Sequence, residues 1–121
     1  MANPVVHFEI IGKDGDATKQ FFTDMFGWSI DSSNPMGYGL VDPGANDQGR
    51  GIAGGISAPV AGQDGYVTIY VQVDDVEAAL AKAESLGGRR LFGPEAVMDG
   101  LTIGIFAEPE GKPVGVLHQS N

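Results

Sequence analysis

The chain has 121 residues, enough for one domain, and its 16 acidic and 7 basic side chains give a formal net charge of −9. Nucleic acids and anionic membrane surfaces attract clustered Lys and Arg, so this charge argues against both as the main partner. Because the chain has no cysteine, disulfides, thiolate metal sites and cysteine nucleophiles are excluded, and the only imidazoles are those of His7 and His118.

The first predicted elements are a strand, a helix and a second strand. Alternating side chains over residues 5–10 predict a strand whose polar face carries His7 and Glu9. Apolar residues at helical spacing over 17–25, after an acidic N-cap and before a glycine, predict a helix. A second strand is expected to start at 28–30. The aromatic residues of this region are expected in the core or between helix and sheet; they are Phe21, Phe22, Phe26 and Trp28.

The middle of the chain is less regular. Residues 36–41 predict a short strand that holds Tyr38, and residues 51–57 predict a strand of small side chains. Between them, the polar and glycine-rich residues 42–50 predict a loop. This loop is either a flap over a ligand site or a plain connector.

The second half repeats the opening order. Residues 66–73 predict a strand whose apolar side chains, Val67 and Ile69 among them, are expected to pack against a helix over 76–86. The polar side chains of this strand are then expected on the opposite, concave face; they are Thr68, Tyr70 and Gln72. Three further strands are predicted over 89–92, 101–107 and 114–118, with a turn at 93–94.

These elements form an internal repeat. Residues 26–27 correspond to 86–87, and Asp14 corresponds to Asp74 at the same offset of 60. Each half predicts a strand, a helix and three strands. The expected fold class is therefore α+β, with two βαβββ modules forming an open, curved, mostly antiparallel sheet with a concave cleft. The modules cover about residues 4–58 and 64–119 of a single domain, residues 1–121.

This order of elements resembles the vicinal oxygen chelate superfamily, the fold of glyoxalases, bleomycin resistance proteins and extradiol dioxygenases. The resemblance runs from Val5 to about Gln119 and rests on the segments VVHFEI, FFTDMFGW, GGI, VQVDDVEAALAKAESLGG and FAEPEGKPVGVL. The superfamily includes isomerases, dioxygenases, thiol transferases and antibiotic-binding proteins. The resemblance therefore implies a fold and a homodimer, and leaves the activity to be argued from the site.

The resemblance also implies a divalent metal site, with His and Glu ligands from four strands that face the cleft. His7 matches the first histidine ligand, but Thr68 and Gly115 occupy two of the other positions. The strand over 51–57 contains no His, Asp or Glu for the remaining one. Threonine is a poor ligand and glycine has no side chain, so no metal is expected. The alternative is a weak divalent site made by His7 and Glu9 with water.

Three interpretations of His7 stay open: a histidine hydrogen-bonded to a neighbouring strand residue such as Glu9, a polar anchor in a ligand cleft, or a metal ligand. For catalysis, His7 and Glu9 are the candidate residues, because a carboxylate beside an imidazole can share a proton near neutral pH. The candidate ligand-binding residues are Tyr38, Thr68, Tyr70 and Gln72. The alternative is that these are solvated sheet residues with no role in binding.

The function expected from the sequence is that of a glyoxalase-like protein that binds a small organic molecule and lacks the usual metal site. One alternative is a metal-dependent lyase, isomerase or dioxygenase of the glyoxalase type that uses His7 and Glu9. Another is a drug-sequestering resistance protein, since the charge of −9 suits a cationic compound. A cytoplasmic protein with no membrane partner is expected, because no targeting segment and no apolar stretch near ~20 residues is visible. The charge of −9 argues against a nucleic-acid partner, and the resemblance and the open edges of the curved sheet imply a homodimer.

Overall fold

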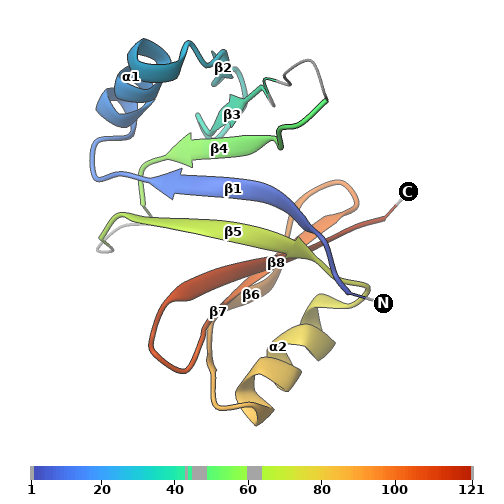
Figure 1. Ribbon diagram of the computed structural model, residues 1–121. Coiled ribbons are helices and arrows are strands. Elements are labelled where there is room, and N and C mark those ends of the chain that lie inside the picture. The colour runs from blue at the N-terminus through green and yellow to red at the C-terminus, as the bar shows by residue number, and fades with distance from the viewer. Residues whose placement is uncertain (1, 43, 45–48, 60–63, 121) are drawn as a thin grey trace. The chain divides into compact units, whose positions relative to one another are not determined.

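A computed structural model of the chain describes residues 2–42, 44, 49–59 and 64–120 (Figure 1). The chain divides into two compact units: the first unit is residues 7–67, and the second unit is residues 1–6 with 68–121. Eight strands and two helices lie within the described residues. Neither of these helices is long and apolar enough to cross a membrane.

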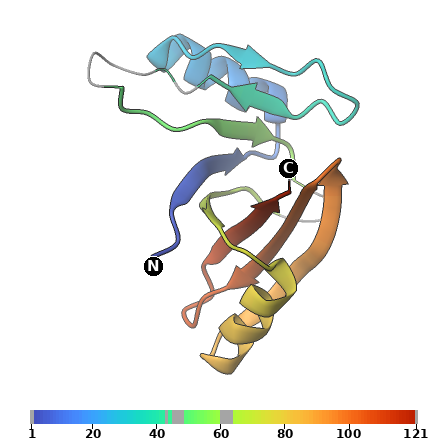
Figure 2. The ribbon, with the colours of Figure 1, turned by 90° about the vertical axis from the view of Figure 1, so that its right-hand side faces the viewer.

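The first unit contains a strand, a helix and three strands along the chain. Its elements are β1 (Val5–Ile11), which starts two residues before the unit, α1 (Gly15–Phe26), β2 (Ile30–Asp31), β3 (Gly39–Val41) and β4 (Gly54–Ser57). The strands pair in the order β2-β3-β4-β1. β1 and β4 run parallel, while the other two pairs run antiparallel. α1 packs against β4 (Figure 2).

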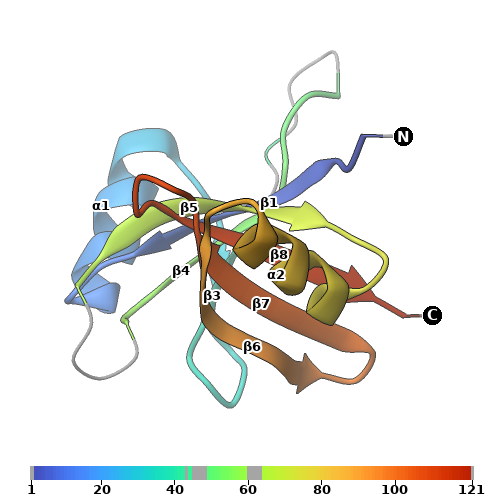
Figure 3. The ribbon, with the colours of Figure 1, turned by 90° about the horizontal axis from the view of Figure 1, so that it is seen from below.

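The second unit repeats this arrangement. Its elements are β5 (Tyr66–Gln72), whose first two residues belong to the first unit, α2 (Val76–Ser85), β6 (Arg89–Met98), β7 (Leu101–Ala107) and β8 (Pro113–Gln119). The strands pair in the order β5-β8-β7-β6, with β5 and β8 parallel and the others antiparallel. α2 packs across β6, β7 and β8 (Figure 3). Both units therefore have one βαβββ topology, which confirms the predicted α+β fold class and its repeat.

Each helix begins at an aspartate N-cap. Asp14 Oδ1 accepts a hydrogen bond from the Ala17 amide at 3.0 Å, and Asp75 Oδ1 accepts one from the Ala78 amide at 3.0 Å. The offset of 60 aligns Asp14 with Asp74, and Asp74 and Asp75 together are expected as turn and cap. The cap therefore lies one residue later than the offset of 60 indicates.

The prediction that the apolar face of β5 packs against α2 is wrong for most of the strand. Val67 is 71% exposed and Ile69 is 40% exposed. The core at α2 instead consists of Val76, Leu80 and Val116, with Val73, Ala79 and Phe106 against it. The cause is the strand order, because α2 covers β6, β7 and β8, and β5 lies beyond β8.

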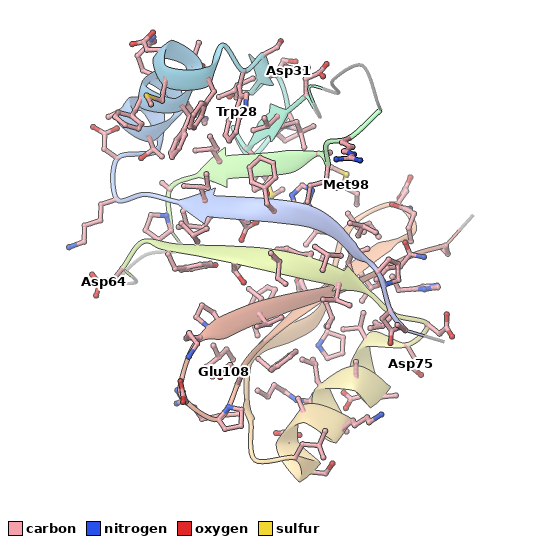
Figure 4. The ribbon with its side chains drawn as sticks, in the orientation of Figure 1. Trp28, Asp31, Asp64, Asp75, Met98 and Glu108 are labelled. Atoms are coloured by element: carbon pink, nitrogen blue, oxygen red, sulfur yellow. The ribbon has the colours of Figure 1, made fainter. Side chains whose placement is uncertain are left out.

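The aromatic residues at α1 are less buried than predicted. Phe21 is 61% exposed and Phe26 is 56% exposed. Phe22 and Trp28 are half-buried and stack with their ring centroids 5.4 Å apart, and Trp28 lies 5.3 Å from the ring of Phe8 (Figure 4). Only part of the predicted aromatic core is therefore inside the protein.

Two loop predictions have different outcomes. The turn predicted at 93–94 is wrong, because β6 continues to Met98 and accommodates these residues with a shift of register between Phe92 and Glu95. Proline has no amide hydrogen for the ladder, so a local irregularity is expected there. Of the predicted loop over 42–50, residues 43 and 45–48 lie outside the described residues, and its role stays a prediction.

Candidate functional site

The polar face of β1 meets the side chain of Tyr38, which comes just before β3. The Tyr38 hydroxyl lies 3.1 Å from His7 Nε2 and donates a hydrogen bond of 2.8 Å to Glu9 Oε2. His7 and Glu9 therefore share one face of the strand, as the alternation predicts. The structure brings together three of the six residues that the sequence singled out.

The turn before β3 holds the backbone of Tyr38. The Asn34 side chain accepts a hydrogen bond of 3.0 Å from the Tyr38 amide and donates one of 2.6 Å to the Tyr38 carbonyl. Gly37 has φ of 65°, a conformation that favours glycine, and its carbonyl accepts a hydrogen bond of 2.8 Å from Lys19 Nζ. These hydrogen bonds fix the backbone from which the Tyr38 phenol extends to β1.

Tyr66, the first residue of β5, joins the same group of side chains. Its pKa is raised to about 12, first by burial and then by the charge of Glu9 and the hydrogen bond to that carboxylate. Sequence reasoning missed Tyr66, although the alternation that selected Thr68 and Tyr70 places Tyr66 on the same face of the strand. We call His7, Glu9, Tyr38 and Tyr66 the polar cluster.

The polar cluster is partly withdrawn from water, because Glu9 is buried and the other three side chains are half-buried. Glu9 is 7% exposed, and burial lowers the pKa of His7 below its ordinary value of 6.5, so the ring is neutral at pH 7. A phenol has one hydrogen, and Tyr38 donates it to Glu9. The contact with His7 is then a hydrogen bond when His7 carries its hydrogen on Nε2. Glu9 is the acceptor of the phenols.

The other three predicted ligand-binding residues belong to the second unit. Thr68 is 5% exposed, and its hydroxyl donates a hydrogen bond of 2.6 Å to the Pro113 carbonyl. Tyr70 is 4% exposed and lies over Gly115, where a Cβ would come within 2.5 Å of its ring. Gln72 is exposed. Thr68 and Tyr70 are therefore buried, not solvated, and a role in ligand binding stays a prediction for all three.

The donor set does not fit the four-ligand metal site that the family resemblance implies. His7 offers a ligand atom, but its Nε2 already lies 3.1 Å from the Tyr38 hydroxyl. At the positions equivalent to two further ligands, the Thr68 hydroxyl is held by a backbone carbonyl and Gly115 offers no donor. Among the residues that the structure describes, no group of three or more His, Asp or Glu could hold a metal ion.

Comparison with known proteins gives one matching family. A model of the Glyoxalase/Bleomycin resistance protein/Dioxygenase superfamily matches residues 5–115. Two curated relatives, each called "Putative glyoxylase CFP32", from Mycobacterium bovis and Mycobacterium tuberculosis, are 32% identical over 111 residues. The match covers 89% of this chain and 42% of each relative, so the chain spans less than half of their length.

Solved structures with the same fold include enzymes. A Streptomyces coelicolor methylmalonyl-CoA epimerase in complex with 2-nitronate-propionyl-CoA has a TM-score of 0.64 and 18% identity, with 100% of both chains covered. A glyoxalase/bleomycin resistance protein/dioxygenase superfamily member from Vibrio splendidus has a TM-score of 0.61 and 14% identity, with 98% of this chain and 100% of that chain covered. At these identities, the likeness shows the fold alone.

Proposed function

Because this chain belongs to the glyoxalase/bleomycin resistance protein/dioxygenase superfamily, whose fold serves several chemistries, we propose its function from its own polar cluster. The protein binds a small organic molecule at this cluster and does so without the divalent metal of the family. The observation that supports this most directly is the Tyr38 hydroxyl, which lies between His7 Nε2 at 3.1 Å and Glu9 Oε2 at 2.8 Å.

The chemistry of the cluster suits a ligand with hydrogen-bonding groups beside a flat apolar part. Tyr38 and Tyr66 supply phenol rings, while the neutral imidazole of His7 and the carboxylate of Glu9 supply polar atoms with little access to water. Buried polar groups of this kind discriminate between ligands, because a ligand that leaves them unpaired binds weakly.

His7 and Glu9 are also the residues that we propose for acid–base chemistry, should the bound molecule be turned over. A neutral imidazole and a carboxylate that share one phenol can pass a proton along these hydrogen bonds. Thr68, Tyr70 and Gln72 are proposed as further ligand-binding residues of the second unit. The protein is proposed to act in the cytoplasm as a homodimer.

The test is a ligand screen by thermal shift on protein purified without chelator or affinity tag, with metal content measured by elemental analysis. A compound that stabilises the wild-type protein should bind at least about tenfold more weakly to Tyr38→Phe and His7→Ala, since Tyr38→Phe removes the hydroxyl that contacts His7 and Glu9, and His7→Ala removes the imidazole. Ser85→Ala removes an exposed hydroxyl of α2 and serves as the matched control.

Two results would overturn the proposed function. Hits that bind equally well to wild type, Tyr38→Phe and His7→Ala would place the ligand elsewhere. Near-stoichiometric metal that disappears in His7→Ala would instead favour a metal-dependent enzyme of the glyoxalase type.

A further inference from the structure

We propose that the Tyr38 phenol excludes a divalent ion from between His7 and Glu9, and that Gly55 is the residue that positions the phenol there. This inference deepens the metal-free binding site proposed above, on which it rests. It assigns a role to Gly55, which lies in β4 and has no chemistry of its own.

The first step concerns the position of the phenol oxygen. It lies within hydrogen-bond distance of both atoms that could ligate an ion jointly, His7 Nε2 at 3.1 Å and Glu9 Oε2 at 2.8 Å. A divalent transition metal shared by these two atoms would need to lie about 2.0–2.2 Å from each of them. Such an ion would occupy the space between the two side chains, where Tyr38 now has its hydroxyl.

The second step concerns the two contacts of the phenol oxygen. The Tyr38 hydroxyl donates its single hydrogen to Glu9 Oε2 and lies 3.1 Å from His7 Nε2. An ion that bound both side chains would have to displace the phenol from both contacts. The phenol therefore opposes an ion by its volume and by the contacts that the ion would have to replace.

The third step concerns the room for the phenol. Gly55 pairs with Glu9 of β1 on one side and with Leu40 of β3 on the other. A Cβ at Gly55 would lie 1.8 Å from the Tyr38 hydroxyl oxygen and 2.0 Å from Cζ, far inside contact distance. With any side chain at this position, the phenol cannot stay between His7 and Glu9.

An alanine at Gly55 should displace the phenol and leave the strand intact. Gly55 is not among the glycines with positive φ, so alanine is compatible with its backbone. The atoms that a Cβ would meet belong to the far end of a side chain, which can turn away. Gly54 provides the matched control: its Cβ would lie 2.2 Å from the ring of Phe8, on the other face of the same strand.

The experiment titrates the full chain with Ni²⁺ alone by calorimetry. We expect Tyr38→Ala and Gly55→Ala to bind Ni²⁺ about tenfold or more tightly than the wild type, because imidazole and carboxylate are then both available. Gly54→Ala should bind like the wild type. The gain should disappear when His7→Ala is combined with Tyr38→Ala.

The inference is overturned if Tyr38→Ala binds Ni²⁺ no better than the wild type, or if the gain survives removal of His7. Should Gly55→Ala fail to fold by circular dichroism, the Tyr38→Ala pair still decides the exclusion of the ion. Folding that returns when Gly55→Ala is combined with Tyr38→Ala then supports the role of Gly55, because no phenol is left for the Cβ to meet, and folding that does not return refutes that role. No organic ligand enters this experiment. A failed ligand screen with a gain of Ni²⁺ binding therefore refutes the proposed function alone, and a successful screen without that gain refutes this inference alone.

Discussion

Glu9 is a carboxylate with only 7% exposure, and its charge is compensated by hydrogen bonds from phenols. A carboxylate that accepts hydrogen bonds from phenols makes those phenols harder to ionise. Tyr66 shows this effect, because its pKa is raised to about 12 by burial and then by Glu9. At the residue scale, the cluster therefore holds a protonated phenol, that of Tyr66, beside the carboxylate of Glu9.

This shift of Tyr66 has a consequence for stability at high pH. In the unfolded chain tyrosine loses its proton near pH 10, and in the folded protein Tyr66 does so at about 12. Between these values the unfolded state binds fewer protons, so the free energy of unfolding falls as the pH rises from about 10 to about 12. We expect Tyr66→Phe to reduce this fall, measured by urea unfolding between about pH 9 and pH 11.5. An equally steep fall in the variant would contradict the assignment.

At the scale of elements, the sequence predicted those features that depend on residues close together in the chain. Alternation placed His7 and Glu9 on one face of β1, and turn and cap residues located both helices. Contacts between distant strands were not predictable in this way. The exposure of Val67 and Ile69 follows from the position of β5 beyond β8, outside the strands that α2 covers. The role of Gly55 likewise depends on its register with Glu9.

The N-cap of α2 offers a direct test of one such local prediction. The repeat indicated Asp74, whereas the structure has Asp75 Oδ1 accepting the Ala78 amide at 3.0 Å. Asp75→Ala should therefore lower the free energy of unfolding by about 1 kcal/mol, while Asp75→Asn should retain most of it. Urea unfolding measures this difference, and Asp74→Ala is the matched control. A larger loss for Asp74→Ala than for Asp75→Ala would show that the cap is Asp74.

At the scale of the whole molecule, two features bear on the proposed homodimer: the net charge of −9 and the apolar surface of α1. Phe21 and Met25 are each 61% exposed and lie one helical turn apart. The ring of Phe21 contacts Phe22, which contacts Phe26, so the exposed apolar groups form a continuous strip. A continuous apolar strip is a candidate contact surface, whereas single exposed apolar residues need no explanation.

Two copies that each carry a charge of −9 repel one another, so association has to come from apolar contacts and should strengthen as salt screens the repulsion. We expect light scattering to give twice the chain mass of 12.6 kDa, with a dissociation constant that falls when NaCl rises from about 20 mM to about 300 mM. Phe21→Ser should weaken the dimer by about tenfold or more, because it removes a large ring from the strip. The control is Leu86→Ser. Leu86 is the C-cap of α2 and is 69% exposed, and its change should leave the dimer as it is.

A monomer at every salt concentration would contradict the homodimer. A dimer weakened by salt would show that ion pairs hold it together and that the strip on α1 does not.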